Sequence, residues 1–348
     1  PELSPARPPP AGAALSSGVH MQAIVFRQGG QVAVETLPDP EPGPGEVLIA
    51  IRASGICHTD IEILRGNYGA SAFPLVPGHE YAGEVLAAGE GVTGFAPGDL
   101  VVADPNLGCG DCPGCRSGRV NLCENLGAYG VTRNGGFAEC CVLRADALVP
   151  APGMDPALAA LAEPMGCVLN GLSPLAGRRI DRALVFGAGP IGMLMGIALR
   201  QRGAEVAMVD LDESRLAMAA EFGLGALPQG SAELDRLRRG CDLAVDATGV
   251  PAVAAGLPGY AANGGNVLYF GVCPPAARIE ISPFEIFRRQ LSLFGTHSLN
   301  RNIAEALEVI QACGPGLGRL ITHRLPLPEI AGVFRAGTPK GAMKVLMA

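Results

Sequence analysis

Short apolar segments separated by proline and glycine dominate the chain from Met21 to about residue 165. The first of them are rich in β-branched residues and lie at Gln22–Phe26, Val32–Thr36 and Glu46–Arg52. Further segments of this kind are Tyr81–Leu86, Asp99–Ala103 and Phe137–Leu143. Their spacing is typical of an antiparallel all-β unit. The pattern therefore predicts a twisted, partly barrel-like β domain over residues 21–165.

Near Asp155 the spacing of apolar residues changes to that of helices. Residues 156–162 and the segment after Glu163 carry Ala and Leu at helical intervals. Strands and helices then alternate, with strands expected at 182–186, 205–209, 242–245 and 266–270 and helices at 193–201, 213–222 and 303–310. This alternation predicts an α/β unit with a parallel doubly wound sheet. Two C-terminal strands are expected to return to the β domain, at 321–325 and 344–347.

These patterns divide the chain into three regions. Residues 1–20 are rich in Pro, Ala and Ser and lack any strand or helix period. We expect them to be a disordered leader, or an over-extended or tagged start, with Met21 as the natural beginning. Residues 21–165 and 302–348 form one predicted domain, and residues 166–301 form the predicted doubly wound domain.

The composition fits a well-buried globular protein. Among 348 residues 48% are apolar and 17% are charged, and the net charge of −7 argues against a general nucleic-acid or anionic-membrane binder. No apolar run reaches the roughly 18 residues that a membrane helix needs. Eleven cysteines, four of them clustered, favour metal-bound thiolates in a reducing cytosol over a secreted disulfide framework. A cytoplasmic location is therefore expected.

The clustered cysteines form one loop, with Cys109, Cys112 and Cys115 three residues apart and Cys123 eight residues further on. Such short spacings let four thiolates surround a zinc ion at roughly 2.3 Å, which leaves no position for a substrate. Two disulfides and a nucleic-acid zinc ribbon are the alternatives, and the ribbon lacks the basic surroundings that it needs. A structural zinc site is the preferred interpretation.

A glycine-rich turn follows the first strand of the doubly wound domain. Gly187, Gly189 and Gly192 have the Gly-x-Gly-x-x-Gly spacing and precede a predicted helix. Such a turn brings backbone N–H groups and a helix N-terminus to a pyrophosphate. Asp210 ends the next strand, where its carboxylate would accept a hydrogen bond from a ribose hydroxyl and repel a 2′-phosphate. NAD is therefore favoured over NADP, although Arg215 lies close enough to weaken this preference.

A second group of potential metal ligands lies in the β domain. Cys57 precedes His79 and Glu80 by about twenty residues, and a Pro/Gly turn leads into the pair. A thiolate and an imidazole brought together by the fold form a borderline-soft zinc site, and a catalytic zinc keeps one position open for substrate. These residues therefore favour a catalytic metal.

Taken in this order along one chain, these motifs resemble the zinc-dependent medium-chain alcohol dehydrogenase superfamily over residues 21–348. The resemblance implies a Rossmann NAD-binding domain and a GroES-like catalytic domain. It also implies two zinc ions per subunit and hydride transfer from an alcohol to the nicotinamide. The resemblance also implies that the cofactor is contacted by Pro190, Ile191 and Thr248.

One departure from the simple alcohol dehydrogenases indicates a branch of this superfamily. In alcohol dehydrogenases whose catalytic zinc is bound by two cysteines, the second cysteine stands at the position that Glu163 occupies here. Glu163 precedes Pro164, as in the polyol and threonine dehydrogenase branch. The resemblance then implies a catalytic zinc set of Cys57, His79, Glu80 and Glu163, in which Glu80 is either a ligand or a partner of one. Cys167 is interpreted as a core residue.

Other residues are assigned by the same resemblance. Thr59 matches a relay hydroxyl that takes the alcohol proton, and His58 matches a position that contacts the pyrophosphate. Some relatives complete the relay with a histidine five residues after the cysteine, where this chain has Glu62. His297 follows a strand of the cofactor domain and is expected either near the nicotinamide or in a structural role.

The expected substrate is a sugar alcohol whose secondary hydroxyl is oxidised to give a ketose. The stretch from Gly127 to Glu139 and the Glu163-Pro164 pair are most similar to arabinitol, ribitol and sorbitol dehydrogenases. The alternatives are an L-threonine 3-dehydrogenase, a simple alcohol dehydrogenase and, in a different class, a non-enzymatic NAD(P)H-binding relative. Relatives are dimers or tetramers, and a homotetramer is expected here.

Overall fold

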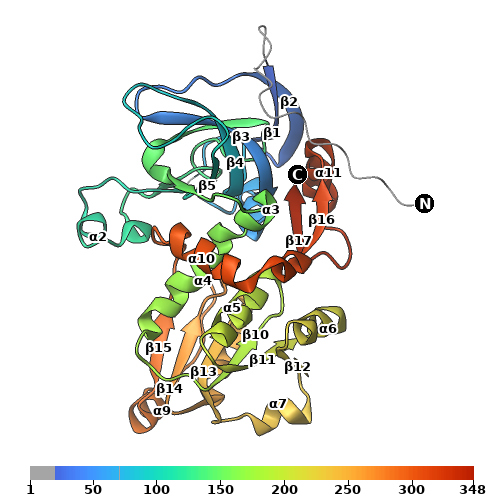
Figure 1. Cartoon of the computed structure of the whole chain (residues 1–348). Coiled ribbons are helices and arrows are strands. Elements are labelled where there is room, and N and C mark those ends of the chain that lie inside the picture. The colour runs from blue at the N-terminus through green and yellow to red at the C-terminus, as the bar shows by residue number, and fades with distance from the viewer. Residues whose placement is uncertain (1–19, 70) are drawn as a thin grey trace.

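The computed structural model describes residues 20–69 and 71–348, which form two halves placed one above the other in Figure 1. The predicted leader lies outside the described residues except for His20. That residue is the first of strand β1 (His20–Arg27), so the prediction is wrong at this position. The reason is that β2 (Gln31–Pro38) is long enough to pair with it, since His20 stands opposite Pro38 in the antiparallel hairpin.

The upper half is built around a seven-stranded sheet with the order β16-β17-β3-β4-β5-β9, to which β8 is added through β3. Its neighbouring strands are antiparallel except for β16 and β17, which are parallel. The strands are β3 (Glu46–Gly55), β4 (Glu80–Ala88), β5 (Leu100–Ala103), β8 (Cys140–Arg144), β9 (Leu148–Pro150), β16 (Ile321–Leu325) and β17 (Lys344–Met347). Around them lie α1 (His58–Leu64), α2 (Pro113–Arg116), α3 (Pro156–Ala159), α11 (Leu327–Ala336) and the short pair β6 (Asn106–Leu107) and β7 (Gly127–Ala128). The predicted return of the C-terminal strands to this half is confirmed.

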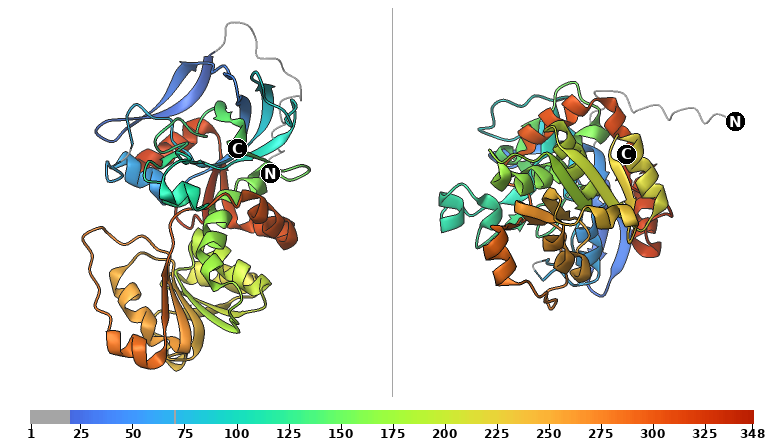
Figure 2. Two further views of the ribbon diagram at one scale, coloured as in Figure 1. Left: turned by 90° about the vertical axis from the view of Figure 1, so that its left-hand side faces the viewer. Right: turned by 90° about the horizontal axis from the view of Figure 1, so that it is seen from below.

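The lower half is a six-stranded parallel sheet with the order β12-β11-β10-β13-β14-β15. Its strands are β10 (Arg182–Phe186), β11 (Glu205–Asp210), β12 (Gly225–Pro228), β13 (Cys241–Asp246), β14 (Ala261–Tyr269) and β15 (Ser292–Gly295). The helices are α4 (Ala162–Leu172), α5 (Pro190–Gln201), α6 (Glu213–Glu221), α7 (Ala232–Arg236), α8 (Pro251–Gly256), α9 (Pro283–Arg289) and α10 (Ile303–Cys313). Figure 2 shows helices on both faces of this sheet, which confirms the predicted doubly wound α/β arrangement.

The helix predicted over residues 156–162 is divided in two. α3 ends at Ala159, and α4 begins at Ala162. Pro164 accounts for the break, because proline lacks an N–H group and is tolerated only in the first turn of a helix. A new helix therefore has to begin just before it.

The strand predicted over 137–143 begins only at Cys140. The residues before it cross between two strands, because Phe137 O accepts from Ile24 N at 2.8 Å and Glu139 O accepts from Ile51 N at 2.9 Å. Their backbone is therefore satisfied without a continuous ladder to one partner.

One buried apolar cluster runs through both halves. It includes Ala82 and Val102 of the upper sheet, Met165 of α4, and Val185 and Met208 of the lower sheet. α4 and α10 lie between the two sheets (Figure 1). The boundary proposed at residues 165 and 166 falls inside α4, so the division into domains stays a prediction. In the part of the chain that the structure describes, we find no helix with the length and apolar character needed to cross a bilayer.

Candidate active site

Cys57, His79 and Glu80 lie together at one end of the strand pair β3–β4. Gly55 of β3 stands opposite Glu80 of β4, so Cys57 and His79 lie just beyond the paired ends. One possible ligand atom from each of the three residues lies within 4.8 Å of the other two. His79 and Glu80 are buried, and Cys57 is half-buried. A thiolate, an imidazole and a carboxylate at this spacing suit a zinc ion.

Asp60, which the sequence analysis did not single out, is fully buried beside these residues. Its carboxylate accepts hydrogen bonds from Cys57 N at 2.9 Å and Gly78 N at 3.3 Å, and its Oδ1 lies 3.4 Å from His79 Nδ1. Burial lowers the pKa of His79, but the attraction of Asp60 and Cys57 outweighs burial and raises it well above its ordinary value. Asp60 thus holds both the imidazole and the start of α1. Its position three residues after Cys57, the spacing of a helix capping box, is the signal that could have identified it.

Lys344 of β17 brings a buried positive charge to the same place. Its Nζ contacts Glu80 Oε2 and donates to Ile56 O at 3.0 Å. Burial raises the pKa of Glu80, and Lys344 and His79 partly offset that rise. Gly55 leaves room for the pair, because a Cβ at this position would collide with both side chains. The sequence analysis treated Lys344 only as the beginning of a strand.

Glu163 is buried in the first turn of α4, within electrostatic range of His79 and Glu80. Among the described residues it stands outside the group of three mutually close ligand atoms, so its predicted role as a ligand stays a proposal. Burial raises the pKa of Glu163 to about 7. The negative charge of Glu80 adds to this rise, and the attraction of His79 partly offsets it. Near neutral pH this carboxyl group can therefore either give up or accept a proton.

Cys167 packs against the large apolar cluster, as predicted, but it also contacts the candidate site. Its thiol donates a hydrogen bond of 3.4 Å to Glu163 Oε1, one helical turn away on α4. Burial raises the pKa of Cys167 well above the ordinary value, so the thiol stays neutral and acts as a donor. The four-residue spacing on a helix, which places two side chains on one face, is the signal that pointed to this contact.

Thr59 and His58 are the first residues of α1. Thr59 is half-buried, whereas His58 is exposed and its Nε2 lies 3.5 Å from Glu62 Oε1. Glu62 also accepts hydrogen bonds from Arg65 and Asn67. His58 therefore extends along the outer face of α1, and its predicted contact with the pyrophosphate stays a prediction, as does the relay role of Thr59.

The four cysteines of the predicted structural site lie at the tip of a loop that we call the lobe (residues 109–123). Their sulfur atoms all lie within 4.8 Å of one another. Backbone N–H groups surround them, since Cys109 N and Asn125 N each donate to Cys123 Sγ at 3.3 Å, and Cys115 N donates to Cys112 Sγ at 3.4 Å. Backbone hydrogen bonds from Cys115 and Glu124 lower the pKa of Cys112 to about 6, whereas the pKa values of Cys109 and Cys115 are raised, that of Cys109 chiefly by its hydrogen bond with Asp111. Donors that favour thiolates fit a zinc site with four sulfur ligands.

The glycine turn connects β10 to α5 as predicted. Gly187 has a φ of 96°, and a Cβ on Gly192 would collide with Gly187 O, so both positions require glycine. Asp210 ends β11 and accepts from Ala188 N at 2.7 Å, while Arg215 Nη1 lies 3.9 Å from its Oδ2. The turn and the acidic residue therefore lie side by side at the carboxyl end of the sheet.

Thr248, also assigned to the cofactor, follows β13. Its hydroxyl donates to the buried Asp246 Oδ1 at 2.6 Å, and its Cγ2 would lie 3.0 Å from a Cβ placed on Gly187. The hydroxyl thus stabilises the turn that packs against the glycine loop. Direct contact of Thr248 with a cofactor stays a prediction.

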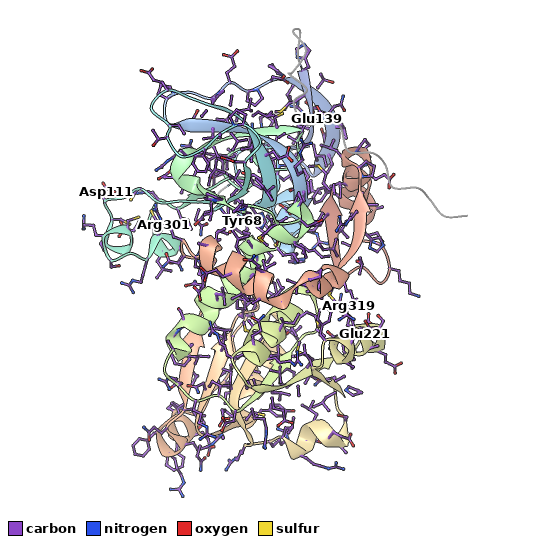
Figure 3. All side chains as sticks on the ribbon, viewed as in Figure 1. Tyr68, Asp111, Glu139, Glu221, Arg301 and Arg319 are labelled. Atoms are coloured by element: carbon purple, nitrogen blue, oxygen red, sulfur yellow. The ribbon has the colours of Figure 1, made fainter. Side chains whose placement is uncertain are left out.

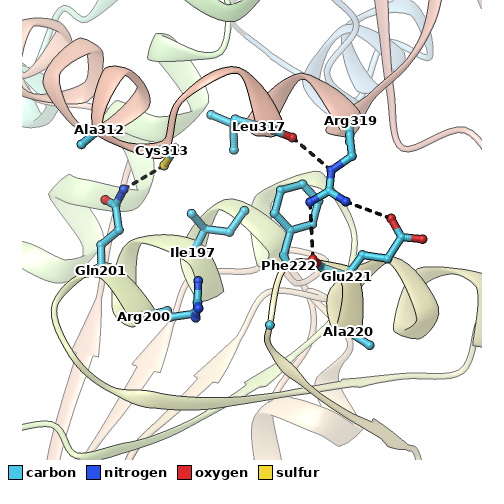
Figure 4. A pocket seen from close by; sticks show the side chains of 12 residues that line it. Ile197, Arg200, Gln201, Ala220, Glu221, Phe222, Ala312, Cys313, Leu317 and Arg319 are labelled. Carbon is cyan, nitrogen blue, oxygen red and sulfur yellow. Dashed lines mark hydrogen bonds and ion pairs between the residues drawn. The ribbon is translucent and has the colours of Figure 1, made fainter.

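A cavity of about 500 Å³ opens away from these residues, between α5, α6 and the 3₁₀ helix η5 (Pro315–Leu320), as Figure 4 shows. Arg319 lies 4.5 Å from the centroid of the Phe222 ring, and its Nη1 is 3.3 Å from Glu221 Oε2. The residues that line this cavity include none of the predicted site residues in the described part of the chain. This cavity is therefore not the candidate active site; it lies where η5 packs against α5 and α6.

Comparisons with known proteins agree with this arrangement. A family model described as the alcohol dehydrogenase GroES-like domain matches residues 43–153, and one described as zinc-binding dehydrogenase matches residues 190–312. D-altritol 5-dehydrogenase from Agrobacterium fabrum is 50% identical over 94% of this chain and 99% of its own length. L-threonine 3-dehydrogenase from Saccharopolyspora erythraea is 33% identical over 89% of this chain and 94% of its own length. The crystal structure of a zinc-binding dehydrogenase from Sinorhizobium meliloti bound to NADP has a TM-score of 0.88 at 31% identity, covering 94% of this chain and 98% of that chain.

Proposed function

Because this chain belongs to the zinc-binding alcohol dehydrogenase family with a GroES-like domain, we propose that it oxidises a secondary hydroxyl of a polyol to a ketone with NAD⁺. The observation that carries the proposal is the cluster of Cys57, His79 and Glu80 with Glu163 beside it. Two buried carboxyl groups near one metal position suit a substrate with neighbouring hydroxyls, which donate hydrogen bonds to carboxylates. The 50% identity to a D-altritol 5-dehydrogenase supports a six-carbon sugar alcohol as substrate.

The residues of the chain have distinct parts in this reaction. A zinc ion held by Cys57 and His79, with Glu163 or Glu80, would polarise the substrate hydroxyl and lower its pKa. Cys167 fixes one oxygen of Glu163 and leaves the other for a substrate hydroxyl or a water molecule. Thr59 would receive the proton that leaves the hydroxyl.

A second zinc ion would be held in the lobe by Cys109, Cys112, Cys115 and Cys123. The short distances between their sulfur atoms support this role. Four sulfur ligands leave no position for a substrate, so this ion would stabilise the loop and take no part in the chemistry.

Asp60 is expected to strengthen zinc binding at the catalytic site without touching the ion. In Asp60→Asn the hydrogen bonds and the negative charge beside His79 are weakened, and affinity for the catalytic zinc should fall by about 10- to 100-fold. Competition with a chelator measures this affinity. Glu90→Gln, which alters an exposed loop carboxylate in the same half, should leave it unchanged. Equal affinities in Asp60→Asn and the wild type would show that Asp60 serves only the fold.

Asp210 is proposed to select NAD. Its carboxylate would accept a hydrogen bond from the ribose 2′-hydroxyl and repel the 2′-phosphate of NADP. In Asp210→Ser the ratio of kcat/KM for NADP to that for NAD should rise at least about tenfold, which corresponds to roughly 1.4 kcal/mol. Steady-state kinetics with both cofactors measures the ratio, and Glu213→Gln on α6 is the control. The NADP bound to the Sinorhizobium relative makes this comparison necessary, and an unchanged ratio would remove Asp210 from the selecting residues.

The decisive experiment is turnover across a panel of sugar alcohols with NAD and with NADP, with zinc counted on the same sample. We expect a hexitol such as D-altritol to give the highest kcat/KM, and two zinc ions per subunit. Threonine and ethanol are the comparison substrates. Faster turnover of either one than of every polyol tested would show that the proposed substrate class is wrong.

A further inference from the structure

The lobe is hydrogen-bonded to a segment of the lower half. This segment, which we call the crossover (residues 296–302), leads from β15 to α10. Asn121 Nδ2 donates to His297 O at 2.7 Å, and His297 Nδ1 lies 3.0 Å from Asn121 O. Asn300 makes two further bonds, accepting from Val120 N at 2.9 Å and donating to Gly118 O at 3.0 Å. His297 thus has the structural role that the sequence analysis left as one of two possibilities.

The crossover is also held from inside the molecule. Asn170 of α4 donates to His297 O at 3.2 Å and to Ser298 O at 2.8 Å. Asn302 Nδ2 donates to Gly166 O of α4 at 2.9 Å. The carbonyl of His297 therefore accepts from both the lobe and α4, the helix that carries Glu163.

The backbone of the crossover is strained. Ser298 and Arg301 have φ values of 55° and 54°, in the left-handed region that side chains other than glycine rarely adopt. Each such residue costs on the order of 1–3 kcal/mol and persists only where its surroundings hold it. The asparagine contacts on both sides supply that restraint.

The crossover lies at the edge of the parallel sheet where a cofactor is expected to bind. It begins directly after the carboxyl end of β15, and ligands of open parallel sheets bind at the carboxyl ends of the strands. The lobe extends from the half that carries Cys57. A second tie, from Arg319 to Glu221 and Phe222, lies on the opposite side of the molecule (Figures 3 and 4). The two halves are therefore joined on both sides of the cofactor-binding edge.

We propose that the lobe is a clasp between the two halves, and that its contacts through Asn121 and Asn300 hold the halves in the arrangement that binds the dinucleotide. The inference rests on the proposed function only in taking a nicotinamide dinucleotide as the ligand. Without the clasp the lobe no longer holds the crossover, and the halves stay joined by their shared apolar cluster, by the bonds of Asn106 to Ser298 and Leu299, and by the tie at Arg319. The arrangement of the two halves is then less well fixed. The fraction of molecules ready to bind then falls, and the apparent affinity falls by the same factor. Asn121 and Asn300 are thus positioning residues for the cofactor.

The test is NADH binding by the zinc-loaded, full-length protein, followed by fluorescence. In Asn121→Ala/Asn300→Ala the dissociation constant for NADH should rise about tenfold, with the zinc content unchanged. In Asn300→Asp, which keeps the acceptor for Val120 N but loses the donor to Gly118 O, the rise should be about half as large on a logarithmic scale. KM for NAD⁺ should rise in parallel, whereas KM for the polyol should stay within about twofold of the wild type.

Asn125→Ala is the matched control, since Asn125 is an exposed asparagine two residues after the lobe whose side chain makes no hydrogen bond to the described residues. Its NADH affinity should equal that of the wild type. If the double variant loses zinc or does not fold, the NADH affinity of Asn300→Asp is the test. An unchanged affinity in that variant overturns the clasp. Unchanged affinity in a zinc-loaded double variant overturns it equally. No NADH binding by the wild type would instead overturn the proposed function, and the clasp with it.

Discussion

Cys57→Ala is expected to lower kcat for the polyol by about 10³-fold or more and to remove one of two zinc ions per subunit. The physical reason is that polarisation of the substrate hydroxyl by a metal supplies several kcal/mol, and each 1.36 kcal/mol corresponds to a tenfold change in rate. Cys57 is the only thiol in the group of three mutually close ligand atoms within the described residues. Metal analysis and steady-state kinetics on the same preparation measure both effects.

The control for this prediction is Cys313→Ala. Cys313 is a half-buried thiol on α10 that accepts a hydrogen bond from Gln201, far from the three ligand atoms. Its replacement should leave both zinc ions and most of the turnover. A Cys57→Ala protein that keeps wild-type turnover with a single zinc ion would exclude a catalytic metal at this site.

Lys344→Met is expected to have the largest effect on stability, lowering the free energy of unfolding by about 3–5 kcal/mol. Lys344 and Glu80 form a buried pair, with Nζ also bonded to Ile56 O. Removing one partner leaves the other charge buried and uncompensated, which costs more than the pair itself contributes. Urea unfolding of the zinc-loaded protein measures the change.

The double variant Glu80→Gln/Lys344→Met separates the loss of the pair from the loss of packing. If the uncompensated carboxylate is the cause, the double variant should recover much of the lost stability. Lys344→Met with an unfolding free energy within about 1 kcal/mol of the wild type would show that zinc, and not Lys344, balances the charge of Glu80.

The sequence predicted those parts of the molecule whose causes are local. The glycine turn and Asp210 follow from a strand, a turn and a helix within about thirty residues, and the four cysteines lie within fifteen positions. β-Branched segments predicted most strands because alternation on a half-buried sheet is a local pattern. The possible metal ligands Cys57, His79 and the four cysteines of the lobe could therefore be identified from the sequence, and the structure brings each group together.

The residues that sequence reasoning missed depend on contacts between distant segments. Lys344 reaches Glu80 because β17 pairs with β3, which in turn pairs with β4. Lys344 and Glu80 are 264 positions apart in the sequence (344 minus 80), and no pattern near Lys344 indicates that it has a partner there. The contacts of Asp60 and Cys167 could have been predicted from local spacing. Asp60 stands three residues after Cys57, as in a capping box, and Cys167 stands four residues after Glu163 on one helix.

The dependence of Glu80 on Lys344 also sets an order of events during synthesis. Cys57, His79 and Glu163 are all made before the six strands of the parallel sheet, and Lys344 is made after them. Domains generally fold as they leave the ribosome, amino-terminal parts first. In a growing chain Glu80 is therefore present long before the lysine that balances its charge. The mature charge balance is reached only when β17 joins the edge of β3.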